Sequence, residues 1–150
     1  MPAELFFVGE AAGLNDALRQ VARDYGVERE VHVSTEFVST DCYRDLLIAS
    51  DAAIQLRTYG FGQPSAALAD CISAALPAVA GEELAASCDA PSYVSRVPDH
   101  ISPLLIAEKL AEIWDRRWDR PAFSAERLHY CELHSFERYA RGLTEILGFG

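Results

Sequence analysis

Short apolar runs alternate along this chain with segments whose apolar residues recur at the spacing of a helix. The runs are typical of strands buried in a parallel sheet, the last of them as an edge strand. They lie at 4–8, 30–34, 52–56, 78–80 and 93–97. Helices are expected near 14–25, 42–50, 65–75, 82–87, 102–118 and 136–147. This alternation predicts an α/β fold, Rossmann-like, with an open, mostly parallel, doubly wound sheet flanked by helices.

Local signals mark the ends of several of these helices. Ser65 and Ser102 are suited to accept a hydrogen bond from the first turn, and Pro103 follows at the first helical position. Gly26 and Gly148 stand where a left-handed residue usually closes a helix. These helix ends are therefore predicted from residues at or next to the ends themselves.

Composition limits the classes of partner and compartment. The chain has 150 residues, half of them apolar, which is enough for one domain with its own core. A formal charge of -10 without clustered Lys or Arg argues against a nucleic-acid partner. The four cysteines form no CxxC pair, and no run approaches the roughly 18 apolar residues of a membrane span. We therefore expect reduced thiols and a cytoplasmic protein.

The segment "GFGQPSAALADC", residues 60–71, has the composition of an anion-binding turn. Ser65 is the natural helix cap, and small residues at Ala66 and Ala67 leave the first backbone amides open to a phosphate. Asp70, just over one turn further, is placed to accept hydrogen bonds from a ribose diol. The alternative is an ordinary strand-to-helix turn with an acid near the positive end of the helix dipole.

Several segments resemble, in their order, the C-terminal domain of family 4 retaining glycosyltransferases. They are "LFFVGE", "YGVEREVHVSTEFVS", "LLIASDAAIQLR", "GQPSAALADCISAALPAV" and "HSFERYARGLTEIL". The family has two Rossmann domains in the GT-B architecture. The resemblance implies transfer of a sugar from a UDP- or GDP-sugar to a glycan or lipid acceptor, with retention and without a metal or cofactor.

The resemblance assigns the candidate donor-binding residues. The family's second acid, which holds the donor ribose, falls on Asp70, and its first acid falls on Gly62. In a bacterial branch whose loop is similar to Gly-Glu-Thr-Ser-Gly, the Glu falls on Gln63, the Ser on Ser65 and the last Gly on Ala66. Gln63 can hydrogen-bond sugar hydroxyls, but it cannot stabilise positive charge at an anomeric carbon. The resemblance thus implies ribose binding and leaves no residue assigned as catalytic.

Residues on either side of this segment complete the predicted site. By the resemblance, the segment after the second strand lines the base, mostly through backbone groups, which points to Phe37 and Val38; the alternative is that their side chains belong to the core. Arg57, at the end of the third strand, is suited to a diphosphate or to a surface ion pair. Tyr59 and Phe61 are candidates to flank the sugar or the base, or to pack on the sheet edge.

The resemblance also implies that residues 1–150 form a single C-terminal donor-binding domain, as a fragment of a longer glycosyltransferase. The family opens this domain with a further strand and helix carrying Arg and Lys, and an N-terminal acceptor domain precedes it. We expect the isolated chain to be inactive, with contact to the acceptor, and any contact to the inner membrane, made through the absent domain. Ala75 departs from the family's Gly at that position.

Two other functions are compatible with the sequence, and one possible metal site is not predicted. The domain is alternatively a non-catalytic Rossmann-like interaction module with a degraded site, or half of a nucleotide-sugar epimerase. The stretch "HYCELH", 129–134, superficially resembles a metal cluster. Its ligands would point around most of a helix rather than converge, so no metal site is predicted there.

Overall fold

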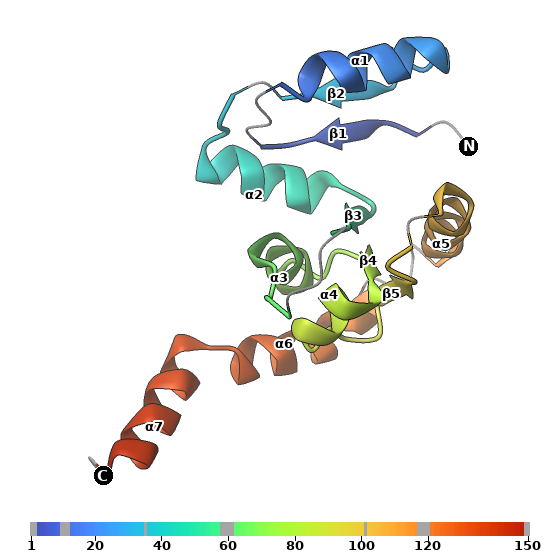
Figure 1. The fold of residues 1–150 in the computed structure, drawn as a ribbon. Coiled ribbons are helices and arrows are strands. Elements are labelled where there is room, and N and C mark those ends of the chain that lie inside the picture. The colour runs from blue at the N-terminus through green and yellow to red at the C-terminus, as the bar shows by residue number, and fades with distance from the viewer. Residues whose placement is uncertain are drawn as a thin grey trace. The chain divides into compact units, whose positions relative to one another are not determined.

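The computed structural model describes residues 3–9, 13–34, 36–57, 62–100, 102–116 and 121–148 (Figure 1). The chain divides into two compact units, Met1–Leu46 and Leu47–Gly150. Every strand pair in the described part is parallel, and helices follow the strands. The predicted α/β class is therefore confirmed.

Unit 1 is a two-stranded parallel sheet with one helix packed on it. Strands β1 (Leu5–Phe7) and β2 (Val31–Val33) pair in register, and α1 (Asn15–Asp24) lies between them in sequence and contacts β2. Helix α2 (Thr40–Ala49) leads out of the unit. Among the described residues of unit 1, only Ala22 is buried. This unit therefore has very little core of its own.

Unit 2 contains a three-stranded parallel sheet in the order β3-β4-β5. Its elements are β3 (Ala53–Gln55), α3 (Ala66–Ser73), β4 (Ala78–Gly81), α4 (Glu82–Ser87), β5 (Val94–Val97), α5 (Pro103–Asp115), α6 (Ser124–Leu133) and α7 (Phe136–Leu147). All four residues of the central strand β4 are buried. This is the pattern of a parallel strand covered on both faces.

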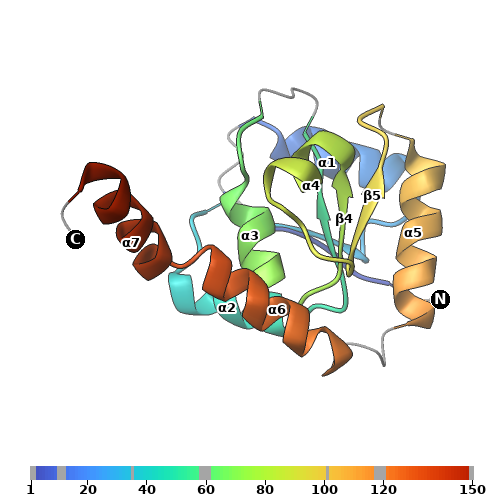
Figure 2. The ribbon, with the colours of Figure 1, turned by 90° about the horizontal axis from the view of Figure 1, so that it is seen from below.

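Successive residues of β4 enter two different apolar clusters. Ala78 and Ala80 pack in the larger cluster, to which α3, α4 and α6 contribute. Val79 packs in the smaller cluster with Ile113 of α5. Since side chains alternate across a strand, the sheet lies between these two layers, with α3 and α6 on one side of it and α5 on the other (Figure 2).

The predicted single open sheet differs from what the structure shows. The described strands form two sheets, β1-β2 and β3-β4-β5, so the prediction holds at the level of parallel strands flanked by helices. Within the described residues, β1 pairs only with β2 and β3 pairs only with β4. In the described part of the chain, β1 and β3 are therefore each paired along one edge and open along the other.

Most helices lie where their local signals placed them. Ser65 and Ser102 cap their helices, accepting from the amides of Leu68 and Leu105. Gly26 and Gly148 have positive φ, as expected after a helix. Helix α6 was not predicted as an element, although the sequence argument against a metal site took residues 129–134 to be helical. The first turn of α6 has no side-chain cap, which removes the signal that marks the start of other helices. Among the described helices, none is both long and apolar enough to cross a bilayer.

Candidate functional site

The N-terminus of α3 presents two backbone amides that have no acceptor among the residues described. The Ser65 side chain accepts a hydrogen bond from the amide of Leu68 at 3.3 Å, and its carbonyl accepts from Ala69 at 2.9 Å. No described residue accepts from the amides of Ala66 and Ala67. Ala66 is exposed and Ala67 half-buried, so a ligand can reach them. The first turn of α3 therefore offers donors to an anion.

Arg57 lies next to this helix start. Its Nη1 donates to the carbonyl oxygen of Gln63 at 3.3 Å, across the segment 58–61. No acidic side chain in the described part of the chain pairs with Arg57, so the predicted surface ion pair is not observed. The structure thus brings Arg57 and Gln63 together, two residues before the cap of α3.

Gly62 has a backbone conformation that suits glycine better than an acidic residue. Its φ is +64°, in the left-handed region that a residue with a Cβ enters only with strain. The family's first acid falls on this residue. A Glu at position 62 would therefore be strained by this backbone, which makes Gly the suited residue here.

Asp70 is exposed on α3. It follows Ala66 by four residues, so the two lie on one face of the helix, about 6 Å apart along its axis. Side chains on a helix lean toward its N-terminus, which directs the carboxylate toward Ala66. No described residue forms an ion pair or a side-chain hydrogen bond with Asp70. Its carboxylate is therefore available to a ligand.

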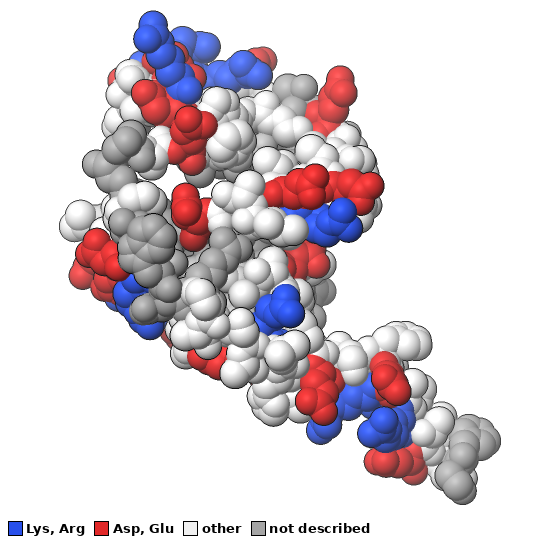
Figure 3. All heavy atoms as spheres, turned by 180° about the vertical axis from the view of Figure 1, so that it is seen from behind, with Lys and Arg blue, Asp and Glu red and all other residues white. Residues whose placement is uncertain are grey.

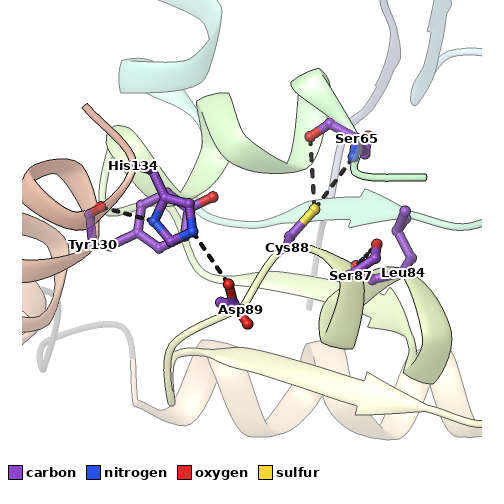
Figure 4. A network of polar contacts seen from close by, with 7 residues as sticks. All are labelled: Ser65, Leu84, Ser87, Cys88, Asp89, Tyr130 and His134. Atoms are coloured by element: carbon purple, nitrogen blue, oxygen red, sulfur yellow. Dashed lines mark hydrogen bonds and ion pairs between the residues drawn. The ribbon is translucent and has the colours of Figure 1, made fainter. Parts of the chain in front are cut away.

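The C-terminal turn of α4 holds the segment before α3. Cys88 Sγ accepts from the amide of Ser65 at 3.3 Å, and the Ser87 hydroxyl donates to the Gln63 carbonyl at 3.3 Å. Figure 4 shows Cys88 directed at Ser65 from this turn. Sequence reasoning missed both residues, because the Cys88 contact joins positions 23 residues apart and leaves no local pattern.

The remaining predicted residues are less well integrated. Phe37 is in unit 1 and 83% exposed, so it is not a core residue of the described structure. Val38, beside it, is half-buried. Tyr59 and Phe61 lie outside the described residues. Of the predicted residues that the structure describes, Arg57, Gly62, Gln63, Ser65, Ala66, Ala67 and Asp70 belong to unit 2, and Phe37 and Val38 belong to unit 1.

The stretch 129–134 forms a stacked pair of rings in place of a metal site. The His134 ring lies 4.1 Å from that of Tyr130, its Nδ1 is 3.0 Å from the Tyr130 carbonyl, and its Nε2 is 3.3 Å from Asp89 Oδ2 (Figure 4). Nowhere in the described ranges do three His, Cys, Asp or Glu side chains gather as metal ligands. His134 instead links α6 to the turn after α4.

The distribution of charge is mixed. On the face drawn in Figure 3, Lys and Arg side chains stand in separate groups among the acidic ones. The chain as a whole carries a formal charge of -10. This face therefore presents no broad positive surface to an anion.

This arrangement can hold a small ligand that carries both an anion and hydroxyl groups. The α3 amides and the Arg57 guanidinium suit phosphate oxygens, and the Asp70 carboxylate accepts from hydroxyls. No family model, curated protein or solved structure matches the chain. Geometry and chemistry are therefore the grounds for a functional proposal.

Proposed function

We propose that this chain is the nucleotide-sugar-binding domain of a retaining glycosyltransferase of GT-B architecture. The donor is a UDP- or GDP-sugar, and the acceptor is a glycan or lipid. The observation that carries this proposal is the juxtaposition of an uncovered α3 N-terminus, the Arg57 guanidinium beside it, and the exposed Asp70 one turn along the same helix.

Each of these groups takes one part of the donor. The amides of Ala66 and Ala67, with Arg57, bind the diphosphate, and Asp70 accepts hydrogen bonds from the ribose diol. Gln63 hydrogen-bonds the sugar hydroxyls. Phe37 and Val38, to which the resemblance gives the base, belong to unit 1 and are no part of this proposal. No cofactor or metal takes part.

The chain alone binds the donor without transferring the sugar. Departure of a nucleotide diphosphate needs several preorganised positive groups. Arg57 is the one Arg or Lys whose side chain contacts the candidate segment in the described part of the structure. Gly62 and Gln63 also supply no acid to the reacting carbon. Transfer therefore belongs to a longer protein, which we place in the cytoplasm on the strength of four free thiols.

The exposed apolar side chains of β1, together with its unpaired edge, support a missing strand–helix unit. Strand β1 is apolar throughout, yet Leu5, Phe6 and Phe7 are 40%, 49% and 37% exposed. The outer strand β2 carries the exposed His32 at its centre, as protected sheet edges often carry a polar residue. We propose that a strand–helix unit outside residues 1–150 pairs with the open edge of β1, and that the acceptor domain is also outside these residues.

Titration with UDP and GDP, followed by amide NMR, tests the donor site. We expect shifts concentrated at Gly62, Gln63 and the first two turns of α3. Asp70→Ala should weaken UDP binding at least tenfold, because hydrogen bonds to a charged group are lost. Asp115→Ala, at an exposed acid on α5 across the sheet, is the matched control and should bind as the wild type does.

Two results would contradict the donor site. One is an unchanged spectrum at millimolar nucleotide. The other is equal UDP affinity for Asp70→Ala and Asp115→Ala, which would leave the carboxylate without a role in binding.

One observation favours the non-catalytic interaction module as a second candidate. Helix α7 exposes apolar side chains along one stripe, with Phe136 and Ile146 each 84% exposed. They line a hollow of about 750 Å³ at the junction with α6, away from the α3 N-terminus. Apolar stripes of this kind are often covered by a protein partner. Absence of nucleotide binding in the titration would favour this candidate.

A further inference from the structure

The turn that ends α4 contacts the candidate donor segment at consecutive residues. The amide of Ser65 donates to Cys88 Sγ at 3.3 Å, and Cys88 Sγ lies 3.9 Å from the Ser65 carbonyl, to which it donates in return. The neighbouring Ser87 hydroxyl lies 3.3 Å from the Gln63 carbonyl and 2.9 Å from the Leu84 carbonyl, so these two oxygens share its one proton. One short turn therefore engages the backbone on both sides of Pro64.

Burial makes the Cys88 contact hard to replace. Ser65 is 4% exposed and Cys88 is 3% exposed, so water has little access to the Ser65 amide. Sγ of Cys88 is the acceptor of that amide among the described residues. A buried amide without an acceptor is costly, so loss of the sulfur would favour movement of the Ser65 backbone.

The Ser65 backbone in turn sets the direction of the α3 amides. With its amide bound to Cys88, Ser65 holds the extended conformation in which its hydroxyl caps Leu68. That cap leaves the amides of Ala66 and Ala67 without an acceptor among the described residues, as the proposed donors to a phosphate. Rotation of Ser65 would therefore move the two proposed phosphate donors.

The other side of the turn is anchored to α6. Asp89 has a φ of +49°, a left-handed conformation that Asp tolerates better than most residues. Its carboxylate lies 3.3 Å from His134 Nε2. Figure 4 shows Cys88 and Asp89 pointing to opposite partners from adjacent positions. The turn is thus fixed by contacts on both sides.

We propose that Cys88 is a positioning residue for the donor site, fixing Ser65 so that the first amides of α3 face the diphosphate. The ligand-binding half of this statement rests on the proposed function. The half that concerns the Ser65 backbone does not, because it follows from contacts within the chain.

Four variants separate positioning from general stability. Cys88→Ala removes both contacts to Ser65, whereas Cys88→Ser keeps a group that accepts from the amide and donates to the carbonyl. Cys71→Ala is the matched control, since Cys71 is also buried in the larger cluster but lies on α3 away from this turn. Ser87→Ala, at a half-buried position, is a milder variant that removes the contact with the Gln63 carbonyl and a bond to the Leu84 carbonyl within α4, and it keeps both contacts of Cys88 with Ser65.

The first measurement is amide hydrogen exchange, compared between Ser65 and strand β4. In Cys88→Ala, the exchange rate of the Ser65 amide should increase about tenfold more than the exchange rates of the β4 amides. Loss of global stability accelerates exchange at both places, whereas loss of the contact with Cys88 accelerates it only at Ser65. In Cys71→Ala both should rise together. If the increase at Ser65 relative to the increase in β4 is the same in Cys88→Ala and in Cys71→Ala, the positioning role is overturned.

The second measurement is the UDP dissociation constant. Cys88→Ala should weaken UDP about fivefold, Cys88→Ser should restore affinity to within about twofold of the wild type, and Cys71→Ala should leave it unchanged. Equal affinities for Cys88→Ala and Cys71→Ala would overturn the role in binding. If the wild type itself binds no UDP, the proposed function fails, while the exchange ratio still decides whether Cys88 positions Ser65.

Discussion

Cys71 is a thiol whose surroundings suppress ionisation. It is completely buried in the larger cluster of unit 2. Burial raises the pKa of its thiol to about 11; a hydrogen bond with the Gln55 side chain acts in the opposite direction, and the neighbouring Asp70 charge adds to the increase. The thiolate is the reactive form, so Cys71 should be inert in the folded protein.

This raised pKa makes stability fall at alkaline pH. Above about pH 9 the unfolded chain loses the Cys71 proton while the folded chain keeps it, so the unfolded state is favoured as pH rises toward 11. Between about pH 8 and pH 10.5 the wild type should lose about 2 kcal/mol more than Cys71→Ala, as measured by urea unfolding at both pH values. An equal loss in the two proteins would contradict this account.

At the scale of the element, α3 ends on a residue that strains its backbone. The amide of Ala75 donates to the Ile72 carbonyl at 3.0 Å, and the amide of Leu76 donates to the Cys71 carbonyl at 2.9 Å, which closes the helix. This closure gives Ala75 a φ of +52°, a conformation that glycine adopts more easily. The Gly that the resembling family has at this position thus has a physical reason.

Ala75→Gly should stabilise the protein by about 0.5–1 kcal/mol, because relief of left-handed strain exceeds the entropy that glycine adds to the unfolded chain. Ala74→Gly is the matched control: Ala74 is also half-buried but has an ordinary φ of −84°, so glycine there should destabilise by a similar amount. Thermal unfolding of the three proteins measures both changes. Destabilisation by Ala75→Gly would show that its methyl packing outweighs the strain.

At the scale of the whole molecule, the two units differ in how much core each has. Unit 2 buries a cluster that spans α3, β4, β5 and α6. Unit 1 buries only Ala22 among its described residues, and its strand β1 has one open apolar edge. Local stability follows buried contacts, so the units should open with different free energies.

Native-state hydrogen exchange tests this difference. Amides of β2 should exchange with an opening free energy at least about 2 kcal/mol below that of β4, which should approach the global value. Adding the proposed strand–helix unit should reduce the gap, because it would cover the open edge of β1. Equal opening free energies in β2 and β4 of residues 1–150 would show that the two units unfold together.

The sequence by itself determined the α/β alternation, the caps at Ser65 and Ser102, the glycine ends at Gly26 and Gly148, and the small exposed turn before Asp70. These features depend on residues within a few positions of one another, so periodicity and capping chemistry reveal them. The predicted neighbours of the α3 cap, Gln63 and Arg57, were found for the same reason.

Only the tertiary structure decided how the strands group into two sheets, and which groups hold the candidate site in place. The contacts of Ser65 with Cys88 and of His134 with Asp89 join residues 23 and 45 positions apart. The exposure of the apolar stripe of α7 could not be predicted from sequence either. An apolar stripe indicates that one face of a helix packs against something, but it does not identify what that face packs against. Such pairings depend on how elements pack in space, which local patterns do not encode.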